Sequence, residues 1–264
     1  MQNIKNSLFV KSFQEIDKRF LIMILLNVLF YVGMVIVIVI GLMVFKVNYE
    51  RLSTTIPFIY SIQSQILEGN MPEFNVQTTA QLEQTKKTFD SFVAVSVILL
   101  VVLFLLINTI ISFFKGYIWS KILHIKFDFT FFKKIALVTM IWSLAWGLLF
   151  VATYLIFKKE YLFYPLVIEG ALFIYFSFIL YSKSNETIKK QLKDTFTIGM
   201  KHIHTILLAI IITSIIFILL FYITKIFTMM FSKFIFYLVI FIIYVLIINW
   251  LRIDIALIIK KLSA

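Results

Sequence analysis

The 264-residue chain contains no cysteine, only 3 prolines and only 7 glycines. The lack of cysteine excludes disulfides, thiolate metal sites and thiol chemistry. Charged residues are scarce at 14%, whereas hydrophobic residues make up 62% and phenylalanine alone occurs 30 times. An average soluble domain is about half apolar, so a soluble core cannot absorb this excess. The composition therefore indicates an integral membrane protein.

Long apolar runs with almost no charge recur along the chain. Six of them are close to or above the roughly 20 residues that cross about 30 Å of hydrocarbon as a helix. They are residues 20–45, 92–114, 135–157, 161–181, 203–223 and 234–251. Because the runs do not alternate between apolar and polar residues, they do not fit a transmembrane β-barrel, and helices are the alternative in lipid. We expect an all-α, polytopic bundle of six transmembrane helices, forming a single membrane domain over residues 1–264.

The segments between the runs carry further expectations. Residues 1–19 place apolar side chains at helical spacing, which predicts an amphipathic helix lying on the membrane surface; a helix docked on the protein is the alternative. Similar amphipathic cytoplasmic segments precede the third and fifth runs. Residues 46–91 form the longest polar stretch, an expected extracytoplasmic loop with a short amphipathic helix near residues 56–67. Residues 78–90 could extend the second span outward.

The distribution of lysine and arginine predicts the orientation. Cytoplasmic loops of membrane proteins hold the excess of these residues, and most of the 25 basic residues fall on one side if the N-terminus is inside. We therefore expect a cell-membrane protein with both termini in the cytoplasm. This bias accounts for the net charge of +12 without a nucleic-acid partner. The expected partners are anionic lipid headgroups at the cytoplasmic face, and a membrane protein or a second copy of the chain.

Glu169 is the only acidic residue within an apolar run. An intramembrane carboxylate is a candidate proton or cation site. Pro165 favours a helix start nearby, so Glu169 could instead reach the outer interface, and a buried structural hydrogen bond is a third interpretation. Ser177 lies eight positions further on, on roughly the same helical face, and Asn108 is another candidate polar residue within a span.

Other polar and small residues in the runs favour helix packing. The amides of Asn27, Asn108 and Asn249 can hydrogen-bond between membrane helices. A stripe of small residues at i, i+4 and i+8 predicts a face that another helix can approach closely. It consists of Thr139, Ser143 and Gly147.

Candidate catalytic residues do not form a recognisable pattern. His124, His202 and His204 all fall in expected cytoplasmic segments, without a zinc signature, a nucleophile motif or a phosphate-binding glycine loop. Asp128, Asp194, Asp254 and Arg252 are scattered. We therefore expect no enzymatic activity, no catalytic residues, no metal and no cofactor.

The layout of the chain resembles a known group of proteins. The run TIKKQLKDTFTIGMKHIHTILLAIII (residues 187–212) is an amphipathic segment that leads into a span, and residues 116–137 look like an earlier copy of this arrangement. Both resemble poorly characterised six-helix prokaryotic membrane proteins related to the membrane domain of glycerophosphodiester phosphodiesterases. The resemblance implies a helical membrane domain and no phosphodiesterase activity, since the separate catalytic domain is absent.

These features favour one class of function over another. A membrane scaffold, assembly factor or lipid-interacting component needs no reactive residues and suits the basic inner surface. The alternative is a small-solute or proton-coupled transporter that uses Glu169.

Overall fold

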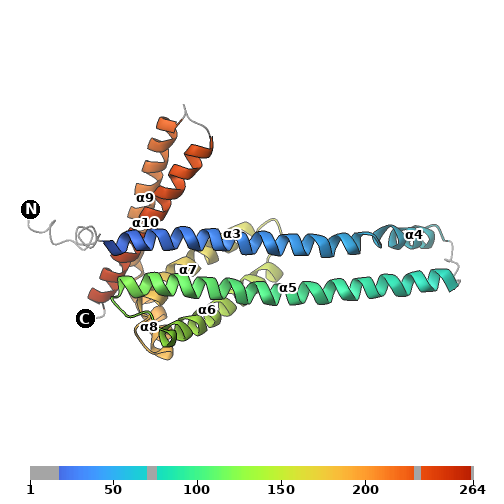
Figure 1. The fold of residues 1–264 in the computed structure, drawn as a ribbon, viewed down its shortest axis with the longest axis horizontal. Coiled ribbons are helices and arrows are strands. Elements are labelled where there is room, and N and C mark those ends of the chain that lie inside the picture. Colours follow the sequence, from blue (N-terminus) through green and yellow to red (C-terminus); the bar gives the residue numbers. More distant parts are fainter. Residues whose placement is uncertain (1–17, 70–75, 229–232, 263–264) are drawn as a thin grey trace, which may run out of the picture. The chain divides into compact units, whose positions relative to one another are not determined.

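The computed structural model describes residues 18–69, 76–228 and 233–262, which contain eight helices and no strand. Figure 1 shows their course. This confirms the all-α class. The helices are α3 (Lys18–Ser53), α4 (Ile56–Leu67), α5 (Val76–Ile122), α6 (Phe129–Ile156), α7 (Phe163–Ser182), α8 (Ile188–Lys201), α9 (Ile203–Thr228) and α10 (Lys233–Leu262).

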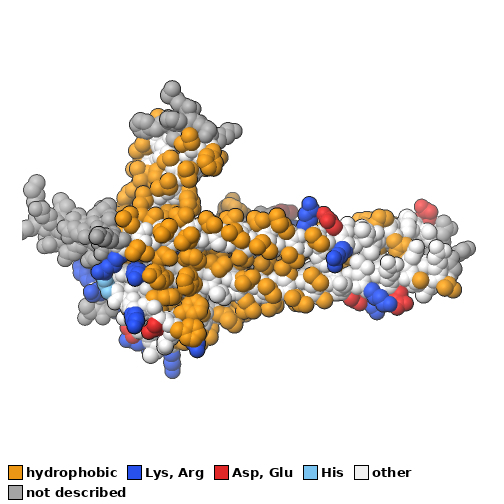
Figure 2. All heavy atoms as spheres, in the orientation of Figure 1, with side chains coloured by type: hydrophobic (Ala, Val, Ile, Leu, Met, Phe, Trp, Pro, Cys, Tyr) orange, Lys and Arg blue, Asp and Glu red, His pale blue; other side chains and the backbone are white. Residues whose placement is uncertain are grey.

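Six of these helices are long and apolar enough to cross a membrane: α3, α5, α6, α7, α9 and α10. Each matches one of the six apolar runs, which overrun their helices only at residue 157 after α6 and at residues 161 and 162 before α7. Many of their large hydrophobic side chains are exposed, and Figure 2 shows hydrophobic side chains over much of the visible helix surface. Such exposure is unfavourable in water and is expected where lipid covers the surface. The chain is a multi-pass membrane protein.

The chain forms two compact units. The first unit comprises residues 1–31 and 110–264, and the second comprises residues 32–109. Helices α3 and α5 each contribute to both units. In the second unit Asn48 joins α3 to α5, because its Nδ2 donates to the Phe92 carbonyl at 3.1 Å and to Ser96 Oγ at 3.2 Å.

Several helices run beyond the predicted spans. The expected loop over residues 46–91 is largely helical: α3 continues to Ser53, α5 starts at Val76, and α4 confirms the short helix predicted near residues 56–67. Helix α10 also continues past residue 251 to Leu262. The physical reason is that polar residues end an apolar run without ending a helix, as the i,i+4 pair Lys87–Glu83 at 2.9 Å in α5 illustrates. The predicted helix over residues 1–19 lies almost wholly outside the described residues.

The core of the first unit lies between α6, α7, α9 (Ile206 and Ala209) and α10, with Trp119 from α5, and partly buried side chains of α8 pack against it. Helix α8 packs against α7 through Gly199, where an added Cβ would lie 2.5 Å from the Phe176 ring. The Tyr175 hydroxyl donates to the Gly199 carbonyl at 2.7 Å. The close approach therefore depends on the missing side chain of Gly199 and holds α8 in place.

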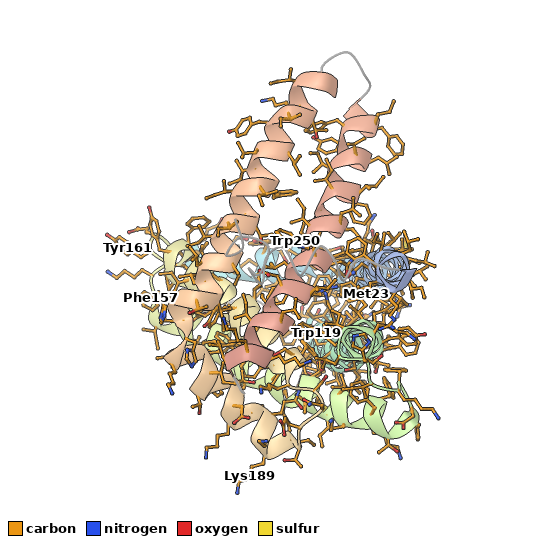
Figure 3. The ribbon with its side chains drawn as sticks, turned by 90° about the vertical axis from the view of Figure 1, so that its left-hand side faces the viewer. Met23, Trp119, Phe157, Tyr161, Lys189 and Trp250 are labelled. Carbon is orange, nitrogen blue, oxygen red and sulfur yellow. The ribbon has the colours of Figure 1, made fainter. Side chains whose placement is uncertain are left out.

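A second hydrophobic cluster joins α3, α5 and α10 within the first unit. It contains Met23, Ile118 and Trp250. Figure 3 labels Met23 and Trp250 on their helices and shows Lys189 of α8 pointing outward. Met23 of this cluster also lines the candidate functional site that is described below.

Candidate functional site

A groove of about 410 Å³ opens at the ends of four helices of the first unit. Its walls come from the start of α3, the end of α5 with the following turn, the turn between α7 and α8, and the last part of α10. Its basic side chains are Arg19, Lys121, His124, Lys183 and Lys260, and its single acid is Glu186. Apolar side chains, among them Met23, Ile122 and Leu257, complete the lining. We call this site the basic groove.

The end of α5 places His124 in the basic groove. The Ile125 amide donates to the Ser120 carbonyl at 2.8 Å, and the His124 amide donates to the Lys121 carbonyl at 3.4 Å. These bonds form a Schellman-type helix end, which puts His124 in the left-handed region at φ 55°. Glycine is the usual residue at this position of such a helix end. The imidazole Nδ1 accepts a hydrogen bond from the Arg19 guanidinium, which ties the turn to α3.

The turn between α7 and α8 is held from α6. Lys134 Nζ donates to the carbonyls of Ser184 and Glu186, the latter at 3.1 Å. Helix α6 is itself fixed at its start, where the Asp128 carboxylate accepts from the Phe131 amide at 2.7 Å. The Lys183 and Glu186 side chains are therefore presented by a turn with fixed backbone.

The single acid of the basic groove is already paired. Glu186 lies 2.8 Å from Lys190, one helical turn away in α8. The hydrogen bond from Lys190 lowers the pKa of the Glu186 carboxyl, and the same contact raises the pKa of Lys190. Since Lys190 neutralises Glu186, the basic groove keeps an excess of positive charge.

A second polar group is buried between α3 and α10. Asn27 and Asn249 are both 0% exposed, and Asn27 Nδ2 donates to Asn249 Oδ1 at 2.6 Å. Arg252 is 2% exposed, and its Nη1 donates to Oδ1 of both asparagines at 3.0 Å. We call these three residues the buried triad. The two amides therefore do bond between helices, and they also hold a guanidinium that the sequence places at the cytoplasmic surface.

The structure does not bring the sequence-predicted site residues together. Glu169 is half-buried and its Oε1 accepts a hydrogen bond from Thr153 of α6, while its Oε2 has no partner among the described residues. It lines neither the basic groove nor the cavity treated below. Ser177 accepts from Trp142 Nε1 at 2.9 Å. Asn108 lies in the second unit, where it donates to the Phe104 carbonyl of its own helix at 2.8 Å.

The three residues of the small-residue stripe have different surroundings in the structure. Thr139 is buried and shares a 3.0 Å hydrogen bond with the Tyr181 hydroxyl of α7. Ser143 is half-buried, and a Cβ added at Gly147 would meet no heavy atom within 4 Å. No described helix therefore packs closely on Gly147, whereas the helical glycines Gly199 and Gly41 do have close contacts, with Phe176 and Leu103 respectively.

Sequence reasoning missed three charged residues of the interior. Lys115 is half-buried with Nζ 4.6 Å from the centre of the Phe30 ring, whereas the sequence places it in a cytoplasmic segment. Asp254 is 4% exposed and its Oδ1 has no partner among the described residues. Lys115 follows the second apolar run, and Arg252 and Asp254 follow the sixth. The spacing of the apolar residues Ile253, Ile255 and Ile258 indicates in the sequence that α10 continues into the core.

No described group of three or more His, Cys, Asp and Glu side chains could hold a metal ion. Comparisons with protein-family models, curated proteins and solved structures find no match for this chain. The resemblance to the membrane domain of glycerophosphodiester phosphodiesterases therefore stays a prediction.

Proposed function

We propose that this protein is a non-enzymatic, lipid-interacting component of the cell membrane that binds anionic phospholipid headgroups in the basic groove. The observation that carries the proposal is the convergence of Arg19, Lys121, Lys183 and Lys260 on one site whose only acid is paired elsewhere. Basic pockets between transmembrane helices on the cytoplasmic side are typical sites for acidic headgroups.

The positions of these residues in the chain support a cytoplasmic orientation for the groove. Each wall belongs to a different segment that the lysine distribution assigns to the inside: the segment before the first span, and those after the second, fourth and sixth spans. An orientation with both termini in the cytoplasm puts all four at the same leaflet. The apolar part of the lining, with Met23, Ile122 and Leu257, suits the glycerol backbone and the first acyl carbons of a lipid.

Native mass spectrometry of the purified chain tests this proposal. Protein in an uncharged detergent is titrated with phosphatidylglycerol and, separately, with phosphatidylcholine. We expect Lys121→Gln combined with Lys260→Gln to weaken phosphatidylglycerol binding by roughly 30-fold, since each lysine near an acidic headgroup contributes about 1 kcal/mol. Phosphatidylcholine binding should change little.

A matched control removes the same charge from the second unit. Lys46 and Lys87 are exposed and pair with Glu50 and Glu83, so Lys46→Gln combined with Lys87→Gln should leave phosphatidylglycerol binding as in the unaltered chain. Equal binding by both double variants and the unaltered chain would overturn the proposed role of the groove.

A further inference from the structure

A second cavity, of about 280 Å³, lies inside the first unit. Its lining is dominated by aromatic rings from α3, α5, α6, α7 and α10, including Trp119, which Figure 3 labels. Among the described residues that line it, Lys115 and Arg252 are the only charged ones, and none is acidic. We call it the aromatic cavity. Its volume is close to the lower limit of small-molecule sites.

The two cations of the aromatic cavity have no acidic partner in the part of the chain that the structure describes. None of the ion pairs within residues 18–69, 76–228 and 233–262 includes Lys115 or Arg252. Arg252 is held through Nη1 by the neutral oxygens of Asn27 and Asn249. These amides orient the guanidinium without neutralising it. A buried cation without an anion is unfavourable, and charged residues that face the interior of a membrane bundle mark ligand sites.

Most of the remaining polar groups of the cavity are already bonded within the protein, which leaves little capacity for a fully polar ligand. The Tyr31 and Tyr244 hydroxyls bond to each other at 3.0 Å. Those of Thr139 and Tyr181 do the same, and Ser177 accepts from Trp142. A ligand with polar atoms on all sides would turn some of them toward aromatic rings. A ligand with one anionic end and an apolar body matches both parts of the lining.

We propose that the aromatic cavity binds a small organic carboxylate, with the carboxylate at Lys115 and Arg252 and the apolar body among the aromatic rings. Arg252 offers the forked donor geometry that carboxylates accept. This site is separate from the basic groove and does not depend on the function proposed for it. A short fatty acid and a soluble aromatic acid share this chemistry.

Tryptophan fluorescence provides the test. All four tryptophans are buried in the first unit, and Trp119 and Trp142 line the aromatic cavity. The full chain in an uncharged detergent is titrated with octanoate, 3-phenylpropionate, their matched alcohols 1-octanol and 3-phenylpropanol, and inorganic phosphate. We expect a saturable change with one or both carboxylates, at least tenfold weaker binding of the matched alcohols, and no change with phosphate. The preferred acid separates a lipid-derived ligand from a soluble aromatic one.

Two variants tie the signal to the cavity. Lys115→Met should weaken carboxylate binding at least tenfold and leave the binding of the alcohols unchanged, whereas Lys46→Met in the second unit should change neither. Ser143→Phe, which fills part of the cavity while keeping both cations in the sequence, should abolish the binding of acids and alcohols alike. Equal affinities for octanoate and 1-octanol, an unchanged response in both cavity variants, or saturable binding of phosphate would overturn the proposal.

Discussion

Replacing Asn27 by leucine removes the centre of the buried triad. The Asn27 side chain accepts from Arg252 at 3.0 Å and donates to Asn249 at 2.6 Å. A hydrogen bond to a charged group is worth about 1.5–3 kcal/mol, and an amide bond between membrane helices is worth about 0.6 kcal/mol or somewhat more. We therefore expect Asn27→Leu to lower the free energy of unfolding by about 2–4 kcal/mol.

Equilibrium unfolding in mixed micelles, followed by tryptophan emission, measures this loss in the first unit, where all four tryptophans lie. Thr213→Val is the matched control, because Thr213 is buried but bonds only along its own helix, to the Ala209 carbonyl at 2.8 Å. It should cost about 1 kcal/mol or less.

A double-mutant cycle tests the physical reason for the loss. Much of the cost of Asn27→Leu comes from an Arg252 charge that loses an acceptor, so the same change should cost at least about 1 kcal/mol less when Arg252 is already methionine. If the two single costs add within about 0.5 kcal/mol, the buried triad is not an interacting unit and the reasoning is refuted.

Four further variants test the packing and the charges. Thermal unfolding should show that Gly199→Ala is destabilising by about 1–3 kcal/mol, since the new Cβ would press on Phe176. Gly147→Ala should be neutral or stabilising by up to about 1 kcal/mol, since the added Cβ meets open space and alanine has the higher helix propensity. If Gly147→Ala were the more destabilising of the two substitutions, the packing described for these glycines would be contradicted. Asn48→Leu should loosen the α3–α5 pair, seen as faster amide exchange at the helix ends of the second unit than at α8. The pKa of the Glu186 carboxyl is lower in the folded protein than in the unfolded chain, so Glu186 stabilises the folded state at a pH above its unfolded pKa, and this stabilisation is lost as the pH falls through its folded pKa. Glu186→Gln should therefore reduce the dependence of the melting temperature on pH in the acid range. An unchanged dependence would count against the contact between Glu186 and Lys190.

Apolar length predicts the elements of this fold well. Each of the six predicted spans coincides with a long helix to within two residues at the ends that overrun it, and the α4 helix was visible in the spacing of Ile56, Ile59 and Leu67. The ends of the helices were harder to predict because a charged residue looks the same in a sequence whether it ends a helix or is buried in one. Arg252 illustrates this, since its burial depends on Asn27, which is 225 residues away in the chain.

The candidate sites depend on such long-range contacts even more strongly. The basic side chains of the groove come from four segments that are distant in sequence, and no spacing rule relates Arg19 to Lys121 or Lys260. Glu169 attracted notice as a lone acid in an apolar run, yet in the structure it bonds to Thr153 and lines neither cavity. The charged residues that line the two candidate sites lie outside the apolar runs, whereas Glu169, the acid within a run, lines neither site.

Photochemical labelling in proteoliposomes is the most direct test of anionic phospholipid binding in the basic groove. A phosphatidylglycerol with a photoreactive group close to its headgroup is activated in membranes that hold the full chain, and the labelled positions are mapped by peptide mass spectrometry. We expect labelling at the walls of the basic groove, around residues 121–125, 183–186 and 256–260. An excess of unlabelled phosphatidylglycerol should suppress this labelling, and an excess of phosphatidylcholine should not. Labelling that is equally strong around residues 46–51, or that both lipids suppress alike, would contradict this expectation.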